Sequence, residues 1–464
     1  MTDGRSRLSA ALRAAFNPID IAWLAALRVL FGLAMAFSMV RFIAYGWIDR
    51  FFVAPAFHFK YWGFAWVEPL SGAGMHQLFW ALAALGLCVA LGVCFRLSAL
   101  LFALGFAYLQ LIDVTTYLNH YYLATLLSLL LALSPAGRAY SVDVWLRPGR
   151  ALEHVPAGVL WLFRFQVGLV YTCAGLAKAT PDWLLHAQPL RIWLNARGDM
   201  PLLGPLLTQP FAAPVMSWAG FLFDATIAWW LLSRRTRPWA FAAVIAFHVL
   251  TRALFPIGMF PVIMVLGALV FFSPSWPRRL LAFARSAIAS PASRPPAERS
   301  SAPTRGQLAI AGIALAYCAL QLALPLRTFA YGPGVSWHEQ GMRWSWRVMV
   351  REKNGSVTFI VRDKRSGRSL HVSPSRYLTA LQEREMSGQP DLILQLAHHI
   401  RADFAARLHG DVEVRVDALV SLNGRRMRAL IDPNVDLSAI RDGLAPASWI
   451  TAAPAEPPPR IRPI

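Results

Sequence analysis

The chain has 464 residues, of which 56% are hydrophobic, and its mean hydropathy of +0.44 is too high for a soluble protein of this length. Its formal net charge is +20, but the arginines concentrate between apolar runs, where they orient a membrane protein rather than bind nucleic acid. Composition therefore favours a polytopic α-helical membrane protein with membrane lipid, and no nucleic acid, as its surroundings.

Residues 1–20 are basic and lack a cleavage site after a short apolar core, so we expect a cytoplasmic N-terminus and no removable signal peptide. About nine apolar segments follow, and each is a candidate transmembrane helix. Their approximate bounds are 21–43, 74–95, 97–112, 121–134, 157–177, 215–233, 238–252, 257–273 and 307–326. The segments at 121–134 and 238–252 are the weakest candidates, because a perpendicular span needs about 20 residues.

The distribution of basic residues predicts the orientation. If the N-terminus is inside and the segments alternate, arginine and lysine are more frequent in the inner loops than in the outer ones. The transmembrane domain then covers residues 21–326 and includes a cytoplasmic linker at about 274–306, whose Ser-, Pro- and Ala-rich part indicates flexibility. The C-terminal region falls outside, which is the periplasmic or lumenal side.

Beyond Pro325 the pattern changes to a period of two, which predicts strands. The stretches are RWSWRVMVRE, GSVTFIVRDK, SLHVSPS and VEVRVDALVSLNG. Residues 390–408 have helical spacing. We therefore expect an extramembrane α+β domain at 327–450 and a disordered, Pro-rich tail at 451–464.

Lysine is rare in this chain and occurs only at Lys60, Lys178, Lys353 and Lys364. Lys178 ends an apolar helix, one turn before Pro-Asp-Trp. It could be a lysine that extends its charge to the membrane boundary. Alternatively it could be a base, because burial disfavours the charged form of lysine, whereas arginine stays protonated.

Other polar residues are predicted at the same outer face. His120 could be an interfacial histidine hydrogen-bonded to a carbonyl, and His248 a histidine satisfied within the core, or each could be part of a site. Asp224 lies within a span and needs a partner, for which we expect Arg28 or Arg164. The segment FPIGMFP, residues 255–261, breaks the helical pattern and could be a simple turn or the wall of a cavity. The cysteines lack the spacing of metal ligands, so we expect no metal site.

Around these candidate residues the chain resembles the vitamin K-dependent gamma-glutamyl carboxylases, as a bacterial-type homologue. The similar stretches occur in the family's order from about residue 40 to residue 450. They are GVCFRLSALLF, NHYYL, YSVDVWL, AGLAKATPDW, LFDATIAWWLL, FHVLTRALFPIGMF, FSPSWPRRL, WSWRVMV and SLNGRRMRALIDPNVD.

The resemblance implies an integral membrane enzyme that couples the oxygenation of a reduced vitamin K to its epoxide with the carboxylation of a protein glutamate to gamma-carboxyglutamate. Its cofactors would be phylloquinol or menaquinol, dioxygen and carbon dioxide, and its partner a glutamate-containing protein or peptide. Lys178 would be the base that acts on the quinol, and His120 the second catalytic residue. The residues expected to bind the cofactor are Asn119, Tyr122, His248, Phe255 and Met259.

The chain also departs from the animal members of that family, since Ala177 stands where they commonly carry a second lysine, and the composition suggests a bacterial inner-membrane protein. Two alternatives stay open. The protein could oxidise a quinol to its epoxide without carboxylation, or it could be a non-catalytic membrane carrier of quinone or lipid. A carrier should tolerate Lys178→Arg, whereas an acid–base enzyme should not.

Overall fold

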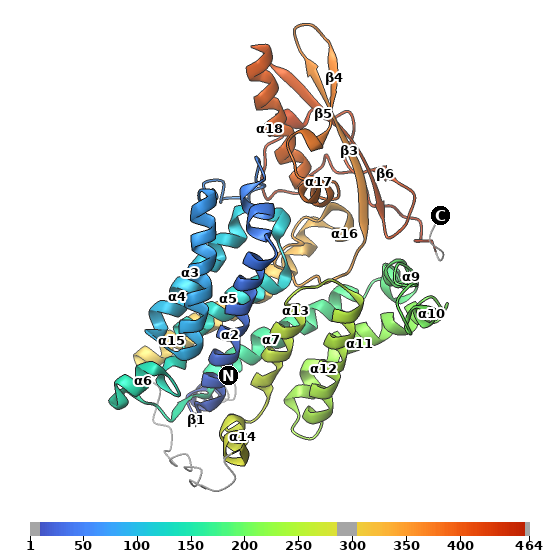
Figure 1. Cartoon of the computed structure of the whole chain (residues 1–464). Helices are drawn as coiled ribbons and strands as arrows, with labels where there is room; N and C mark the ends of the chain where they lie inside the picture. The colour runs from blue at the N-terminus through green and yellow to red at the C-terminus, as the bar shows by residue number, and fades with distance from the viewer. Residues whose placement is uncertain (1–9, 285–303, 460–464) are drawn as a thin grey trace, which may run out of the picture.

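The computed structural model describes residues 10–284 and 304–459, which form a helical bundle and a C-terminal region built on a sheet (Figure 1). The main helices of the bundle are α2 (Ala22–Ala44), α3 (Gly72–Leu91), α4 (Phe95–Ile112), α5 (Asn119–Leu133), α7 (Ala157–Lys178), α11 (Ala212–Leu232), α12 (Arg237–Leu254), α13 (Phe260–Ala268) and α15 (Arg305–Leu326). Shorter elements connect them, namely β1 (Pro18–Asp20), α6 (Val142–Leu146), β2 (His154–Pro156), α8 (Pro181–Leu184), α9 (Leu190–Asn195), α10 (Gly204–Leu207) and α14 (Trp276–Ala284).

Each apolar segment predicted from the sequence contains a helix, but not every helix is long and apolar enough to cross a membrane. Within the described ranges six helices are, by length and composition: α2, α3, α4, α7, α11 and α15. Helices α13 and α14, bent by 98° at their junction, would add a seventh as one broken span. Helix α5 has 15 residues, and at about 1.5 Å per residue it is shorter than a hydrocarbon core of about 30 Å. The prediction of nine spans is therefore not confirmed.

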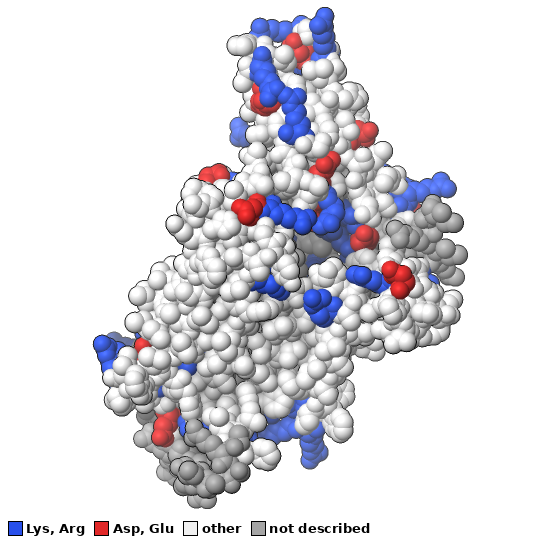
Figure 2. All heavy atoms as spheres, in the orientation of Figure 1, with Lys and Arg blue, Asp and Glu red and all other residues white. Residues whose placement is uncertain are grey.

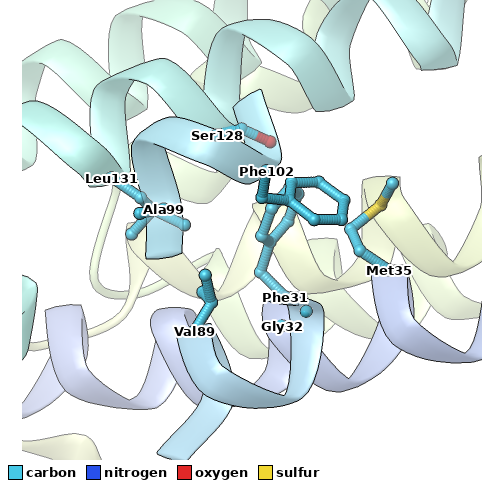
Figure 3. Close-up of a pocket in the computed structure, with 9 residues that line it drawn as sticks. Phe31, Gly32, Met35, Val89, Ala99, Phe102, Ser128 and Leu131 are labelled. Carbon is cyan, nitrogen blue, oxygen red and sulfur yellow. The ribbon is translucent and has the colours of Figure 1, made fainter. Parts of the chain in front are cut away.

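Glycines allow the first two long helices to pack with their backbones in contact. A Cβ atom at Gly32 would lie 2.5 Å from the backbone nitrogen of Ala90, and one at Gly86 would lie 2.9 Å from that of Ala36. A gap of about 10 Å³ remains beside this crossing, between α2, α3, α4 and α5 (Figure 3). Its one polar side chain, Ser128, donates its hydroxyl proton to the carbonyl of Ala124. The gap is therefore a packing defect and not a ligand site.

The C-terminal region is a four-stranded antiparallel sheet in the order β4-β3-β5-β6. Its elements are α16 (Val335–His338), β3 (Lys353–Asp363), β4 (Ser369–Val372), α17 (Ala380–Met386), α18 (Pro390–Leu408), β5 (Val412–Leu422) and β6 (Arg428–Ala429). Alternate side chains of β3 and β5 form one core with α18, and Phe59 and Tyr61 of the bundle are part of it. The sheet region therefore shares its core with the membrane domain.

Two predictions for this region were wrong. Residues 343–352 alternate like a strand, but only the three following predicted strands form, and 343–352 is an irregular segment over the bundle. The tail was expected to be disordered, yet residues 451–459 pack against the protein. Arg425 donates to the carbonyl of Glu456, and Gln188 donates to that of Pro459. Residues 460–464 and 285–303, including most of the predicted flexible linker, lie outside the described residues.

Candidate functional site

Lys178 is the last residue of α7, and its position depends on a close approach of α7 to α11. A Cβ atom at Gly175 would lie 2.5 Å from the backbone nitrogen of Ala225, so only glycine permits this contact. The contact is one residue from Asp224 and less than one turn from Lys178. After Ala179 the chain turns into α8, where the Thr180 hydroxyl accepts a hydrogen bond from the backbone of Trp183.

Lys178 and Asp224 form an ion pair that is shielded from solvent. The Nζ atom lies 2.8 Å from Oδ2 of Asp224, and the two residues are 5% and 6% exposed. Nζ also donates to the carbonyls of Ala174 and Val348, both at 3.3 Å. Three acceptors match the three protons of an ammonium group. The lysine is therefore buried and fully hydrogen-bonded, rather than extended to the membrane boundary.

The prediction that Arg28 or Arg164 pairs with Asp224 was wrong. Arg28 is buried, but its guanidinium donates to the carbonyls of Ala136, Ala139 and Tyr140. Arg164 likewise donates to three carbonyls that follow α13, those of residues 270–272. Both arginines are satisfied by backbone oxygens, so neither is available to a carboxylate.

The ion pair lies in a cavity of about 80 Å³, here called the lysine cavity. Aromatic and aliphatic side chains make up most of its wall. It is lined by Val170, Tyr171, Ala174, Lys178, Trp183, Leu190, Trp193, Met216, Gly220, Asp224, Phe247, Thr251, Phe255, Ile257, Phe260, Met264, Val348 and Met349. Flat apolar side chains around one polar group form a surface that suits an aromatic ring carrying a hydroxyl.

A second cavity, of about 490 Å³, adjoins the first and is here called the histidine cavity. It extends from the bundle to helix α17 of the C-terminal region. It is lined by Met39, Arg41, Phe42, Trp47, Phe51, Phe52, Phe79, Phe106, Leu109, Gln110, Thr115, Thr116, Tyr117, Leu118, Asn119, His120, Tyr121, Pro256, Ile257, Gly258, Phe260, Val348, Met349, Leu381, Arg384 and Glu385. Figure 2 shows a hollow in the surface between the two parts of the molecule, with basic and acidic side chains around it.

Four residues line both cavities and form a partition between them: Ile257, Phe260, Val348 and Met349. Ile257 and Phe260 come from the FPIGMFP segment, and Val348 and Met349 come from the irregular segment. The FPIGMFP segment is thus a cavity wall rather than a simple turn. In the irregular segment Trp344, Trp346 and Met349 have positive φ angles of 61°, 58° and 51°. Such angles cost non-glycine residues about 1–3 kcal/mol and are found mainly at functional sites.

Bundle side chains hold the irregular segment over the cavities. The Tyr117 hydroxyl accepts a hydrogen bond from the backbone of Trp344 at 2.8 Å. The Asn119 amide donates to the carbonyl of Arg347 at 3.3 Å. Together with the bond from Lys178, these contacts use backbone groups that a strand would pair with a neighbouring strand. This explains why the alternating sequence does not form a strand here.

The structure brings together some of the predicted site residues. Lys178 and Phe255 line the lysine cavity, and Asn119 and His120 line the histidine cavity. His120 is 6% exposed, and its Nε2 atom has no hydrogen-bond partner among residues 10–284 and 304–459. The ring of Phe260 in the partition lies 6.0 Å from that of His120.

Other predicted residues lie behind the cavity walls. His248 is 1% exposed and hydrogen-bonded through Nε2 to the Tyr171 hydroxyl, with Phe260 packed edge-on against it. Tyr122 hydrogen-bonds to Gln321 of α15 and stacks on Trp346. Met259 is buried in the core of the bundle. These three residues line neither cavity, so they can affect a ligand only through the residues that do.

A second ion pair fixes the C-terminal region beside the lysine cavity. Arg425 binds both carboxylate oxygens of Asp182 at 2.6 Å, and Asn423 donates to the same carboxylate at 2.7 Å. Burial alone would raise the pKa of Asp182, but the hydrogen bonds from Arg425 and Asn423 outweigh it, so the pKa is lowered. The sequence places Asp182 and residues 423–425 far apart, and nothing in it indicated this contact.

Sequence reasoning also missed the carbonyl of Val348 and the side chain of Arg41. Val348 was assigned to a strand, and Arg41, near the end of the first apolar segment, was not proposed as a site residue. For Arg41 a signal existed, since it lies within four residues of the end of an apolar helix. For Val348 no signal existed, because a carbonyl is present at every position.

Comparison with known families assigns both parts of the molecule. Residues 16–276 match the HTTM domain family, and residues 307–456 match the lumenal domain of vitamin K-dependent gamma-carboxylase. No solved structure matches this chain.

Proposed function

Because this chain belongs to the vitamin K-dependent gamma-carboxylase family, we propose that it is a membrane enzyme that carboxylates glutamate side chains of a protein or peptide. In this proposal a reduced vitamin K, phylloquinol or menaquinol, is converted to its epoxide by dioxygen in the same catalytic cycle. The bound quinol supplies the strong base for the carboxylation, since no protein side chain is basic enough. The carboxyl group comes from carbon dioxide.

The lysine cavity has the features that a quinol ring would need. Trp183, Trp193 and Phe247 offer flat apolar surfaces to the ring, and Lys178 and Asp224 offer polar contacts to its hydroxyl group. This arrangement, a single buried ion pair in an apolar cavity, is the observation that carries the proposal.

We assign the proton transfer to the pair rather than to the lysine alone. In apolar surroundings an ion pair loses much of its advantage over the neutral pair, because both charges are removed from water. Asp224 can therefore take a proton from the ammonium group of Lys178 at 2.8 Å. The neutral amine is then able to accept a proton from a hydroxyl group in the lysine cavity. The carbonyl of Val348 keeps the amine oriented throughout.

The glutamate substrate is assigned to the histidine cavity, on the other side of the partition. This cavity extends to α17 of the C-terminal region, from which a peptide could reach His120. The aromatic side chains beside His120, Tyr121 and Phe260, would limit the access of water, which would otherwise reprotonate a reactive carbon. His120 would contact the substrate, and Asn119 would hold the segment that closes the cavity.

For the topology we propose that the N-terminus is cytoplasmic and that the C-terminal region is periplasmic, in a bacterial inner membrane. Helices α5, α12 and α13 would then also cross the membrane within the bundle, giving nine spans in all. This follows from the bias of arginine toward the inner loops.

The test is to purify the protein and supply a reduced vitamin K, labelled bicarbonate, dioxygen and a glutamate peptide. Epoxide formation and incorporation of label are measured separately, because an epoxidase without carboxylation would give only the first. We expect Lys178→Arg to lose about 10²–10⁴-fold in turnover with quinol binding retained, since arginine cannot give up its proton. Lys364→Arg, at an exposed lysine, is the control. Absence of epoxide with every quinol tried would contradict the proposal.

A further inference from the structure

Arg41 stands apart from the other arginines inside the bundle. It lies in the last turn of α2, and its Nε atom is buried without a hydrogen-bond partner in the described ranges. Neither a carboxylate nor a carbonyl contacts its guanidinium among residues 10–284 and 304–459, whereas Arg28 and Arg164 each bind three carbonyls. The ring of Trp47 lies under the guanidinium, with its centroid 5.0 Å from the guanidinium carbon. Arg41 is half-buried and lines the histidine cavity, and a partly desolvated cation without an acceptor is costly unless a ligand supplies one.

Arg41 and His120 are directed at the same point of the histidine cavity. A methyl group at Gly258 would lie 3.6 Å from Nη2 of Arg41 and 3.8 Å from Nε2 of His120. That Nε2 atom is buried without a partner, and among the described residues the Arg41 guanidinium makes no hydrogen bond, with its Nε atom also buried. Nη2 of Arg41 and Nε2 of His120 therefore both face the space in front of Gly258. Gly258 has a φ of +59°, which other residues adopt only with strain, and the absence of a side chain keeps this space open.

We propose that this space is a carboxylate subsite and that Arg41 binds the side-chain carboxylate of the glutamate to be modified. The proposal rests on the function proposed above, and it adds the residue that would select glutamate over glutamine. A guanidinium offers two parallel N–H donors that match the two oxygens of a carboxylate. The cation–π contact with Trp47 limits the freedom of the guanidinium, so less freedom is lost on binding.

The other charges that line the cavity do not compete for this role. Arg384 and Glu385 line its far end, on α17, and are paired with each other at 3.2 Å. A peptide that entered between α17 and the bundle would therefore meet a neutral pair first and the unpaired Arg41 afterwards. The apolar stretch between them, which includes Phe51 and Leu109, would accommodate the aliphatic part of the glutamate side chain.

The test is a binding measurement that does not depend on turnover. The probes are the fluorescently labelled peptide acetyl-Ala-Leu-Glu-Leu-Ala and its counterpart with Gln in place of Glu, and binding to the detergent-solubilised full chain is followed by anisotropy. We expect Arg41→Met to weaken binding of the Glu peptide by roughly tenfold to a hundredfold and to leave the Gln peptide unchanged. Arg41→Lys should restore part of the preference. The control is Arg50→Gln, at an exposed arginine that lines neither cavity.

A second pair of variants tests the space itself. Gly258→Ala should weaken binding of the Glu peptide because the added methyl group fills the subsite. Gly46→Ala introduces alanine at a φ of +63°, with no atom within 4 Å, and so reproduces the backbone strain without the filling. Equal losses in both variants would overturn the proposal. An unchanged preference for the Glu peptide over the Gln peptide in Arg41→Met would also overturn it.

The outcomes separate this inference from the proposed function. A preference for Glu that depends on Arg41, in a protein that forms neither epoxide nor carboxylated peptide, would support the subsite and contradict the enzyme. Carboxylation with the same peptide affinity in Arg41→Met would support the enzyme and contradict the subsite.

Discussion

The lysine cavity and the histidine cavity share a partition, but they treat buried charge in opposite ways. In the lysine cavity the cation and the anion, Lys178 and Asp224, are 2.8 Å apart and neutralise each other. In the histidine cavity the buried nitrogens of Arg41 and His120 have no partner among the described residues. An internally balanced pair suits the transfer of a proton, whereas an unbalanced cation suits the capture of an anion. In the proposed reaction this difference suits two ligands, a neutral quinol and a negatively charged glutamate.

The largest expected effect comes from unbalancing the lysine cavity. Asp224→Asn or Lys178→Met alone should destabilise the bundle by about 3–5 kcal/mol, because either change leaves one buried charge without its partner. The double variant Lys178→Met, Asp224→Asn should recover much of that loss. Thermal unfolding of the four proteins in detergent measures the coupling. Additive losses would show that the two groups do not stabilise each other.

A smaller effect is expected from opening the partition between the cavities. Met349→Gly removes a side chain that lines both cavities, and it also relieves a φ of 51°. If the partition couples quinol epoxidation to glutamate carboxylation, this variant should form several times more epoxide per carboxylated glutamate than the unmodified protein. His409→Gly relieves a similar φ of 50° at the end of α18, in a residue that lines neither cavity, and should leave the ratio unchanged. A ratio that shifts equally in both would point to backbone strain instead.

The smallest effect concerns the ion pair outside both cavities. The folded-state pKa of Asp182 is lowered, so its contribution to stability is present above the ordinary aspartate pKa of about 3.9 and is lost as the pH falls below it. Asp182→Asn should therefore cost about 1–3 kcal/mol at neutral pH and flatten the acid limb of the stability curve. Hydrogen exchange of residues 423–426 reports the contact. Asp411→Asn, at an exposed pair, should leave the stability curve nearly unchanged, because solvent screens that pair.

The sequence was sufficient to locate the elements and insufficient to position them against one another. Apolar runs predicted the helices closely, and the spacing of residues 390–408 matches α18 at both ends. The partner of Asp224 could not be predicted, because it depends on which face of α7 meets α11. The alternation at 343–352 is a strand pattern that hydrogen bonds from Tyr117, Asn119 and Lys178 override. Local patterns contain no information about such distant donors.

The candidate site was predicted only in part, because local sequence patterns do not show which distant segments come together. Lys178 and His120 were identified from their residue types and from the resemblance to a family, and each lines a cavity. Their placement in two separate cavities was not foreseen, since it follows from a partition whose halves are about ninety residues apart in the chain. Arg41 was overlooked because an arginine at the end of an apolar helix is also the usual marker of a membrane boundary.

The origin of the partition has a consequence for the order in which the protein matures. Val348 and Met349 leave the ribosome after every apolar helix has been made, so the newly inserted bundle lacks half of the wall between its cavities. Until the chain beyond α15 folds back onto the bundle, Lys178 also lacks the carbonyl of Val348. In a nascent or truncated chain, the amine of Lys178 would therefore be accessible to water. Folding of the last segment onto the bundle is then the step that completes the partition between the two cavities.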